Sequence, residues 1–459
     1  MRRDARGLPV TTDSAEAVAA LDAFADAFIR YADNAAVLLD AVKADPGCAL
    51  AQAYAAMLHM LLESREAPDL ARPYRDAALK AVQAPAGVTD RERLLVDAAR
   101  AWVEGDPATV LARLEAVVRD HPRDLLAMKL AQYHHLNFGN FAGMLRVAEM
   151  AAEPYRDDPH WLGMAAFAYE QLHLLEEAEA AASRALERTE AEPWAQHALA
   201  HVMETRGRMR DGVAFLRSVS HHWDGCNSFL YTHNWWHLAL FHLDLDEPGE
   251  VLRIHDAHVW GRWKAYSQDQ AGAVSLLVRL ELRGVDVGDR WRDVADHVAA
   301  RGDDHVQPFL DLHYVYALAR DGRAGADRYL DSLEAHAATV PDIARRQWRD
   351  VAVPLARGMA AHARGDWDHA ATAMAPAMPN HILVGGSHAQ RDLFEQVYLD
   401  ALVRSGRHEE AQQRLELRRL ARPDVRHTHR QLAGVYAALG LPREAARAAG
   451  RGGRPPRPA

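Results

Sequence analysis

The spacing of chain-breaking residues constrains this fold more than any other feature of the sequence. Pro159 and Pro193 lie 34 residues apart, and each opens a segment with two helix-forming stretches and a short break between them. The predicted helices run over 160–172 and 176–188, then over 194–205 and 209–218. Small residues, mainly alanine, fall where the two helices of each hairpin must cross closely. The pattern predicts antiparallel helical hairpins in succession.

A helical hairpin that recurs every 34 residues is typical of the tetratricopeptide repeat. Alanine, leucine, arginine and glutamate dominate the chain, and no sustained alternating β-branched stretch appears. Looser copies of the hairpin pattern occupy residues 46–83, 89–119, 122–152, 308–337, 354–374, 391–419 and 425–448. We therefore predict an all-α, tetratricopeptide-type α-solenoid of roughly twelve to fifteen helices, wound into a right-handed superhelix with a concave central pocket.

The same patterns predict the domain organisation. Residues 1–12 carry mixed charge without periodicity and are predicted to be disordered. Residues 13–449 are predicted to form a single helical-repeat domain with an irregular centre at about 219–300. Residues 450–459, GRGGRPPRPA, are predicted to be a disordered tail, because this Gly, Pro and Arg composition does not form a packed helix.

Composition bears on compartment and partners. The two cysteines cannot form a disulfide framework and no signal peptide opens the chain, so we expect a cytoplasmic protein. We expect no membrane partner, because no long uncharged apolar run is present. The net charge of −10 argues against a nucleic-acid partner. The alanine- and arginine-rich, lysine-poor composition suggests a bacterial genome rich in GC.

Two histidine pairs are the main candidates for chemistry. His197 and His201 lie four apart with Glu204 three residues further on, and His233 and His237 lie four apart in the run HNWWH. Residues four apart share one helix face, so two neighbouring helices could bring four imidazoles and a carboxylate together. These five residues are the candidate catalytic residues. Three interpretations stay open: a ligand pocket without metal, a metal site, and a crowded core of hydrogen-bonded histidines.

The residue types favour a pocket without metal. Ala198 stands where the zinc-protease motif H-E-x-x-H has its glutamate, and a structural zinc site would normally bring cysteines. Glu204 could instead accept a hydrogen bond from an imidazole and fix its tautomer. We therefore expect neither a metal ion nor a cofactor.

Two further polar motifs are predicted to line the same concave face. The run QYHHLN lies near the end of a predicted helix, where a helix C-cap is the alternative interpretation. The run GGSHAQRD is typical of a turn into a helix, with Ser387 as the N-cap; a capped helix with a surface arginine is the alternative. The predicted lining residues are Tyr133, His134, Asn137, Trp236, His388, Gln390 and Arg391.

Three strings in this chain resemble a known family. HALAHVMETRGRMRDGVAFL, CNSFLYTHNWWHLALFHLD and GGSHAQRDLFEQ are similar to sequences of the tetratricopeptide repeat protein 38 family, and the similarity extends over roughly residues 15–440. The resemblance implies an all-helical repeat fold. It implies no established reaction, because the family is named for its architecture.

A centre rich in histidine and tryptophan favours a closed pocket over an open peptide groove. We predict a tetratricopeptide repeat protein whose concave pocket binds a small molecule or a short peptide. The first alternative is a small-molecule enzyme that uses the pocket histidines for acid–base chemistry, with metal-assisted chemistry ranked below it. The second alternative is a structural adaptor for protein interactions. Enzymatic activity, ligand identity and oligomeric state are left open.

Overall fold

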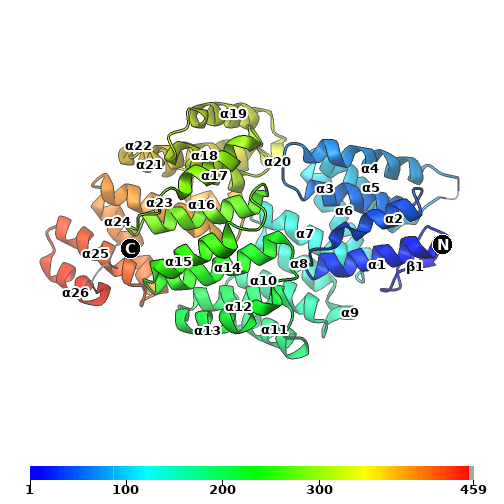
Figure 1. Ribbon diagram of the computed structural model, residues 1–459, viewed down its shortest axis with the longest axis horizontal. Helices are drawn as coiled ribbons and strands as arrows, with labels where there is room; N and C mark the ends of the chain where they lie inside the picture. The colour runs from blue at the N-terminus through cyan, green and yellow to red at the C-terminus, as the bar shows by residue number, and fades with distance from the viewer. Residues whose placement is uncertain (86, 454–459) are drawn as a thin grey trace. The chain divides into compact units, whose positions relative to one another are not determined.

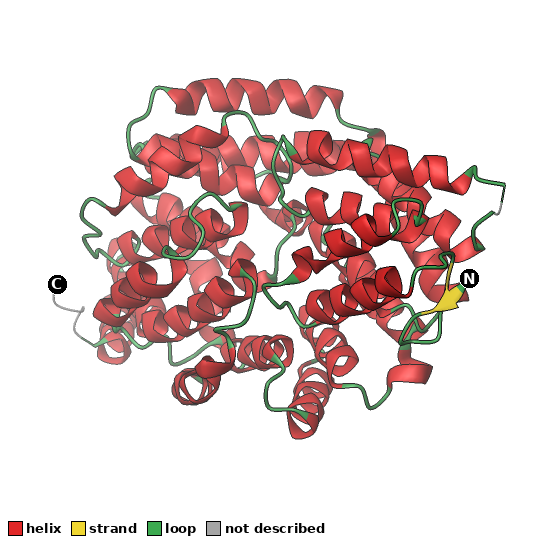
Figure 2. Cartoon of the chain, turned by 45° about the vertical axis from the view of Figure 1, so that its right-hand side comes forward, coloured by secondary structure: helices red, strands yellow, loops and turns green. Residues whose placement is uncertain are grey.

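The computed structural model describes residues 1–85 and 87–453, and these residues are helical almost throughout (Figures 1 and 2). They form 26 α-helices, and the sheet found among them has only two short strands. The prediction of an all-α repeat fold is confirmed. The predicted helix count was too low, partly because some helix boundaries carry no Gly or Pro signal. Only Ala151, for example, separates two helices that end at Met150 and begin at Ala152.

The described chain divides into two compact units, where the sequence predicted one domain. The first unit comprises residues 1–199 and 222–230, and the second comprises residues 200–221 and the chain from Tyr231 onward. Two helices contribute to both units: α12, Pro193–Thr205, and α14, Ser228–Asp244. A periodic pattern cannot reveal this division, because the helical repeat continues through it.

The first unit consists of a strand pair and successive helical hairpins. Its elements are β1 Arg2–Arg3, β2 Pro9–Val10, α1 Ala15–Ile29, α2 Leu38–Ala44, α3 Ala49–Met60, α4 Ala67–Val82, α5 Asp90–Val103, α6 Pro107–Asp120, α7 Leu125–Asn137, α8 Phe141–Met150, α9 Ala152–Tyr155, α10 Pro159–Gln171 and α11 Leu175–Arg188. The hairpin of α10 and α11 agrees with the predicted helices to within two residues. The predicted small residues of this hairpin are all buried: Ala165, Ala168, Ala178, Ala181 and Ala185.

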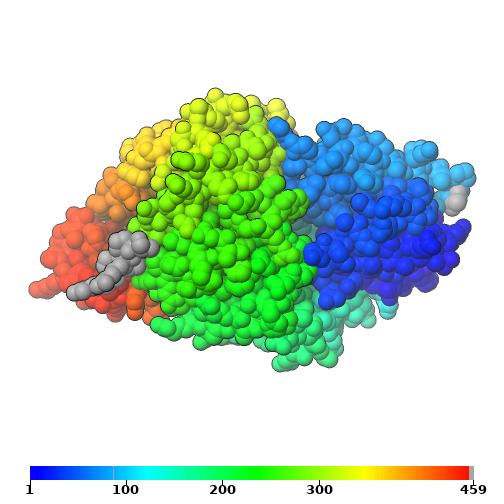
Figure 3. Space-filling model, viewed as in Figure 1, coloured from blue at the N-terminus to red at the C-terminus, as the bar shows by residue number. Residues whose placement is uncertain are grey.

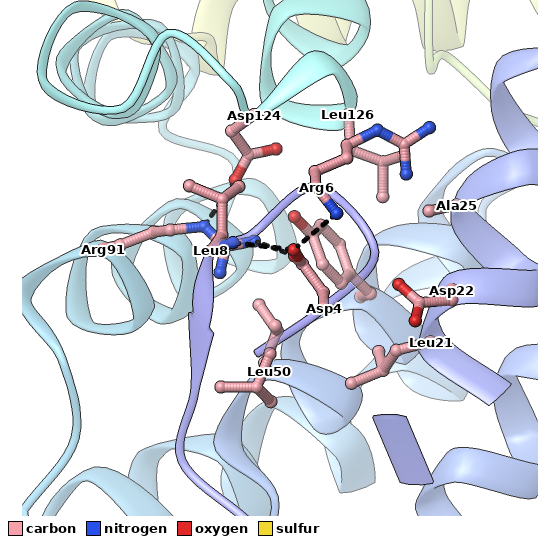
Figure 4. Close-up of a pocket in the computed structure, with 12 residues that line it drawn as sticks. Asp4, Arg6, Leu8, Leu21, Asp22, Ala25, Leu50, Arg91, Asp124 and Leu126 are labelled. Carbon is pink, nitrogen blue, oxygen red and sulfur yellow. Dashed lines mark hydrogen bonds and ion pairs between the residues drawn. The ribbon is translucent and has the colours of Figure 1, made fainter. Parts of the chain in front are cut away.

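The N-terminal segment differs from the predicted disorder. Residues 2–3 and 9–10 form an antiparallel pair, and Thr11 donates its backbone N–H and its hydroxyl to Glu92 of α5. Arg91, also of α5, donates to the carbonyl of Pro9 and pairs with Asp124 at 2.7 Å. Figure 4 shows Arg91 and Asp124 together with Asp4 and Leu8 of this segment around a cavity of about 30 Å³. Contacts with residues some eighty positions away order this segment, so its local composition misled the prediction.

The second unit continues the hairpins and includes the predicted irregular centre. Its helices, besides parts of α12 and α14, are α13 Met209–Val219, α15 Pro248–Ile254, α16 Ser267–Glu281, α17 Arg290–Arg301, α18 Pro308–Arg320, α19 Gly325–Thr339, α20 Asp342–Arg345, α21 Val353–Ala363, α22 Trp367–Met374, α23 His388–Arg404, α24 His408–Ala421, α25 Arg426–Ala438 and α26 Pro442–Gly452. Helices occupy most of 219–300, with a π-helical turn at His255–Val259. Residues 450–452, from the predicted tail, belong to α26, whereas 454–459 lie outside the described residues.

Side chains cover the helices on the face shown in the space-filling view (Figure 3), and apolar side chains are buried along the helices of both units. Small residues set the closest approaches. Gly212 of α13 is buried against the ring of Phe241 on α14, so a side chain at this position would collide with that ring. No helix among the described residues is both long enough and apolar enough to cross a bilayer.

The crossing of α13 and α14 gives a first prediction. Gly212→Ala should lower the free energy of unfolding by about 1–3 kcal/mol, because the new methyl group overpacks against Phe241. The matched control is Gly434→Ala in α25, where an added Cβ meets no atom within 4 Å. That substitution should raise stability by about 0.5–1 kcal/mol through helix propensity alone. Urea unfolding of both variants measures the contrast, and equal effects of the two substitutions would contradict this packing.

Candidate functional site

Four histidines from three helices come together in the second unit. His201 lies on α12, His233 and His237 lie on α14, and His388 is the first residue of α23. The ring of His201 lies 4.4 Å from that of His237 and 5.4 Å from that of His388, centroid to centroid. The rings of His233 and His237 are 4.8 Å apart. These four residues are called the histidine cluster below.

Burial distinguishes this cluster from a surface group of histidines. His201 and His237 are completely buried, and His233 is 9% exposed. Burial, together with the nearby His388 and Arg279, lowers the pKa of His237 to about 3. Burial likewise lowers the pKa of His233 well below its ordinary value. Both imidazoles are therefore neutral near pH 7, each with one ring nitrogen that can accept a proton or bind a ligand.

Helix geometry explains why these side chains meet. The i, i+4 spacing of His233 and His237 places both on one face of α14, as the sequence predicted. The start of α23 is fixed by a capping box: Ser387 Oγ accepts from the backbone of Gln390, and the side chain of Gln390 accepts from the backbone of Ser387. The hydroxyl of Thr205 lies 3.5 Å from Nε2 of His388.

Gly386 makes the sharp turn before α23 possible. Its φ of +75° favours glycine, and a Cβ there would come within 3.0 Å of Phe309. Arg391, 4% exposed, donates from its guanidinium to the carbonyl of Gly386. Gln390 and Arg391, both predicted to line the pocket, thus take part in building this turn.

A carboxyl group lies at the edge of the cluster. Oε2 of Glu204 lies 3.5 Å from Nδ1 of His237, and its Oε1 lies 3.8 Å from the guanidinium of Arg422. Burial raises the pKa of Glu204, and the charge of Arg422 opposes that effect. The sequence placed Glu204 beside the histidines of its own helix, whereas the structure pairs it with His237 of α14.

Trp236 and Arg279 border the cluster on another side. The ring of Trp236 stacks on His233 with centroids 5.2 Å apart, and its N–H donates to the hydroxyl of Ser275. The guanidinium carbon of Arg279 lies 5.5 Å from the Trp236 ring. Arg279 donates to Ser275 Oγ at 2.5 Å and to the carbonyl of Ala389 at 2.8 Å.

Arg279 is an unusual buried cation. It is 1% exposed, and burial lowers its pKa to about 10. Within residues 1–85 and 87–453, no carboxylate lies within 4.0 Å of its guanidinium nitrogens. The charges of Asp392 and Glu204 act on it only from a greater distance. A buried guanidinium without a contacting carboxylate is a natural place for an anionic group to bind.

Beside the cluster lies a network of paired charges. Arg422 reaches Asp244 at 3.2 Å and Asp392 at 3.6 Å, and Arg418 donates to Asp392 at 3.1 Å. Burial alone would raise the pKa of Asp392, but Arg418 and Arg422 hold it well below its ordinary value. This network joins α23 to α24 and to the end of α14.

The remaining predicted site residues lie in the first unit. His197 stacks on Trp194 with ring centroids 4.3 Å apart and also contacts Phe167. The ring of His134 lies edge-on against Trp102, and Tyr133 donates its hydroxyl to Glu63 at 2.8 Å. Asn137 is the last residue of α7 and is half-buried. Tyr133, His134 and Trp102 thus form an aromatic group within that unit.

Sequence reasoning missed Arg279 and Arg422. An arginine inside the apolar run SLLVRLEL is a signal of a buried charge, so Arg279 could have been found. Arg422 follows α24, more than two hundred residues after Glu204, and no local pattern links the two.

No family model matches the chain. Several solved structures of helical-repeat proteins are similar over most of its length. The human IFIT1 dimer with PPP-AAAA is 12% identical, with a TM-score of 0.42, and the match covers 86% of this chain and 90% of that chain. Yeast Tom70 is 13% identical, with a TM-score of 0.30 and coverages of 87% and 90%. The TPR domain of P58(IPK) is 14% identical, with a TM-score of 0.23 and coverages of 79% and 92%.

These neighbours are tetratricopeptide-type helical-repeat proteins. The all-α repeat fold of this chain is evident from its own succession of helices. The prediction that nucleic acid is not a partner is wrong as an exclusion, because IFIT1 is seen with capped or triphosphate RNA. The physical reason is that a net charge averages over the whole surface. Phosphate contacts depend on a few local cations, which a net charge of −10 does not forbid.

The charge network gives a second prediction. Asp392→Asn should lower the free energy of unfolding by about 1–3 kcal/mol, because the partly buried Arg418 and Arg422 both lose this partner. The depressed pKa of Asp392 means that its contribution is lost only as the pH falls through that low value, so the deficit should persist at pH 5.

The matched control is Asp368→Asn, which breaks an exposed pair with Arg407 and should cost less than about 1 kcal/mol. Chemical denaturation at pH 7 and pH 5 makes the comparison. Similar losses for the two variants would show that Asp392 is no more important than a surface carboxylate.

Proposed function

We propose that this chain is a tetratricopeptide-type repeat protein that binds a small anionic molecule at the histidine cluster of its second unit. The observation that supports this most is the meeting of four imidazoles and the carboxyl group of Glu204 from three helices. Apolar residues would fill such a volume without the desolvation that polar groups require. A polar cluster retained in this position is better explained by binding than by packing.

The small size of the proposed ligand follows from the burial of the side chains that would contact it. An extended peptide needs an exposed groove along which its backbone can form hydrogen bonds. His201 and His237 are completely buried and Trp236 is 2% exposed, so these side chains cannot contact such a segment from solvent. A small molecule enclosed by the protein can reach them, as is usual for ligand sites lined by aromatic groups.

The negative charge of the ligand follows from Arg279. Its guanidinium is buried near the cluster and contacts only a hydroxyl and a backbone carbonyl among the described polar groups. A carboxylate on the ligand would give this cation the opposite charge that it lacks at close range. Planar, forked binding of carboxylates is the interaction for which arginine is best suited.

A second candidate is an acid–base enzyme of the same site. The contact between Glu204 and His237, at 3.5 Å and out of solvent, would allow a carboxyl group and an imidazole to act on one bound substrate. In that case Glu204→Gln would abolish turnover while ligand binding persists.

Two further assignments belong to the same proposal. Three sequence strings support membership of the tetratricopeptide repeat protein 38 family. A reducing cytoplasm is the proposed compartment, because Cys48 and Cys226 are both buried and form no disulfide among the described residues.

A thermal-shift experiment tests the proposed ligand. Acetate, succinate and benzoate should raise the melting temperature of the protein, whereas acetamide, succinamide and benzamide should not, because only the acids pair with Arg279. Arg279→Met and His237→Ala should each abolish the response. Arg320→Met, which removes an exposed pair with Glu281, should leave it intact. Equal responses to acids and amides would contradict an anionic ligand, and a response that survives in both site variants would place binding elsewhere.

A further inference from the structure

We infer that His201, His233 and His237 bind a divalent first-row transition-metal ion, for which Zn²⁺ is the reference. The inference deepens the proposed function and rests on the histidine cluster being a ligand site. Each of these histidines offers one ring nitrogen, and these nitrogens lie within 4.8 Å of one another. Three is the number of protein ligands that a catalytic zinc site normally uses.

The distances fit a site that closes slightly on its ion. A tetrahedral zinc ion holds imidazole nitrogens about 2.1 Å away, which sets them roughly 3.4 Å from one another. Small rotations of the side chains would bring nitrogens that start at most 4.8 Å apart into that geometry. His233 and His237 supply two ligands from one face of α14, and His201 supplies the third from α12. Ligands on helices keep their positions better than ligands on loops.

Glu204 completes an arrangement that is common around protein-bound metals. A ligating histidine usually gives its second ring N–H to a carboxylate, which fixes the tautomer and strengthens the metal–nitrogen bond. Oε2 of Glu204 lies 3.5 Å from Nδ1 of His237, so Nε2 of the same ring is the nitrogen left for the ion. Glu204 is therefore a positioning residue in this inference and not a metal ligand.

The ligand types indicate which ions would bind. Imidazole nitrogens suit Zn²⁺, Co²⁺, Ni²⁺, Cu²⁺ and Fe²⁺, whereas Mg²⁺ and Ca²⁺ prefer oxygen ligands. Neither cysteine of the chain belongs to the second unit, so no thiolate from that unit enters the set. Three imidazoles leave a coordination position open, and the carboxylate of the proposed ligand would fill it.

The sequence favoured a metal-free pocket because the motif H-E-x-x-H is absent. That absence excludes only one type of zinc site, which differs in geometry from the histidine cluster. That motif places two ligands and a glutamate on a single helix. Here the pair of ligands lies on α14, and the glutamate approaches from α12. Ala198 in the position of the motif's glutamate is therefore no obstacle to the site.

Metal titration of the full chain tests the inference. Protein dialysed against EDTA and then titrated with Co²⁺ should bind a single equivalent and develop the strong visible bands of a tetrahedral ion. Zn²⁺ should displace the Co²⁺, and elemental analysis should give the same stoichiometry. His201→Ala, His233→Ala and His237→Ala should each weaken binding by at least tenfold. Glu204→Gln should weaken it by about 10- to 100-fold.

His369→Ala, a substitution of a histidine that is 60% exposed, is the control and should bind as the wild type does. Circular dichroism of each variant establishes whether it is folded. If a variant does not fold, the Co²⁺ stoichiometry of the wild type alone tests the inference. Substoichiometric binding by the wild type, or undiminished binding by the three alanine variants, would overturn the inference. A carboxylate-induced thermal shift in a wild-type protein that binds no Co²⁺ would overturn the metal site while leaving the proposed function intact. Stoichiometric binding of Co²⁺ without any carboxylate-induced thermal shift would support the metal site and overturn the anionic ligand.

Discussion

Close crossing of helices on small residues is the interaction on which the rest of this structure depends. Gly212 allows α13 to pack directly against Phe241 of α14, and α14 carries two histidines of the cluster on one face. In the first unit, buried alanines play the same part between α10 and α11. Helices that approach this closely hold the side chains on their inner faces in fixed positions. Such positions are what a preorganised binding site requires.

The buried polar groups of the second unit are of two kinds: charged groups in contacting ion pairs, and neutral histidines beside a cation. Asp392, Arg418 and Arg422 form contacting pairs, which offset the desolvation of buried charge. The histidine cluster is different, because burial keeps His233 and His237 neutral and no carboxylate in the described part of the chain contacts Arg279. The paired network is suited to holding α23 and α24 in place. The neutral imidazoles and the nearby cation are suited to binding an anionic ligand from solution.

Local patterns were sufficient to predict part of this arrangement. Proline and alanine spacing predicted α10 and α11, the i, i+4 rule predicted the shared face of His233 and His237, and Ser387 was predicted to be an N-cap. What the sequence could not reveal depends on contacts between distant segments. Arg422 reaches Glu204 from more than two hundred residues away, and strand pairing with anchoring on α5 orders the N-terminal segment. Sequence patterns within a segment the length of one helix do not predict such contacts.

The central claim is that the histidines of the cluster are retained for binding and do not hold the helices together. The free energy of unfolding of the triple variant His201→Leu, His233→Leu and His237→Leu, measured by urea denaturation in the presence of EDTA, tests it most directly. Leucine has nearly the volume of histidine and needs no polar partner, so a binding role predicts a stability equal to or above that of the wild type. A loss of more than about 3 kcal/mol would contradict the account, because the imidazoles would then be structural.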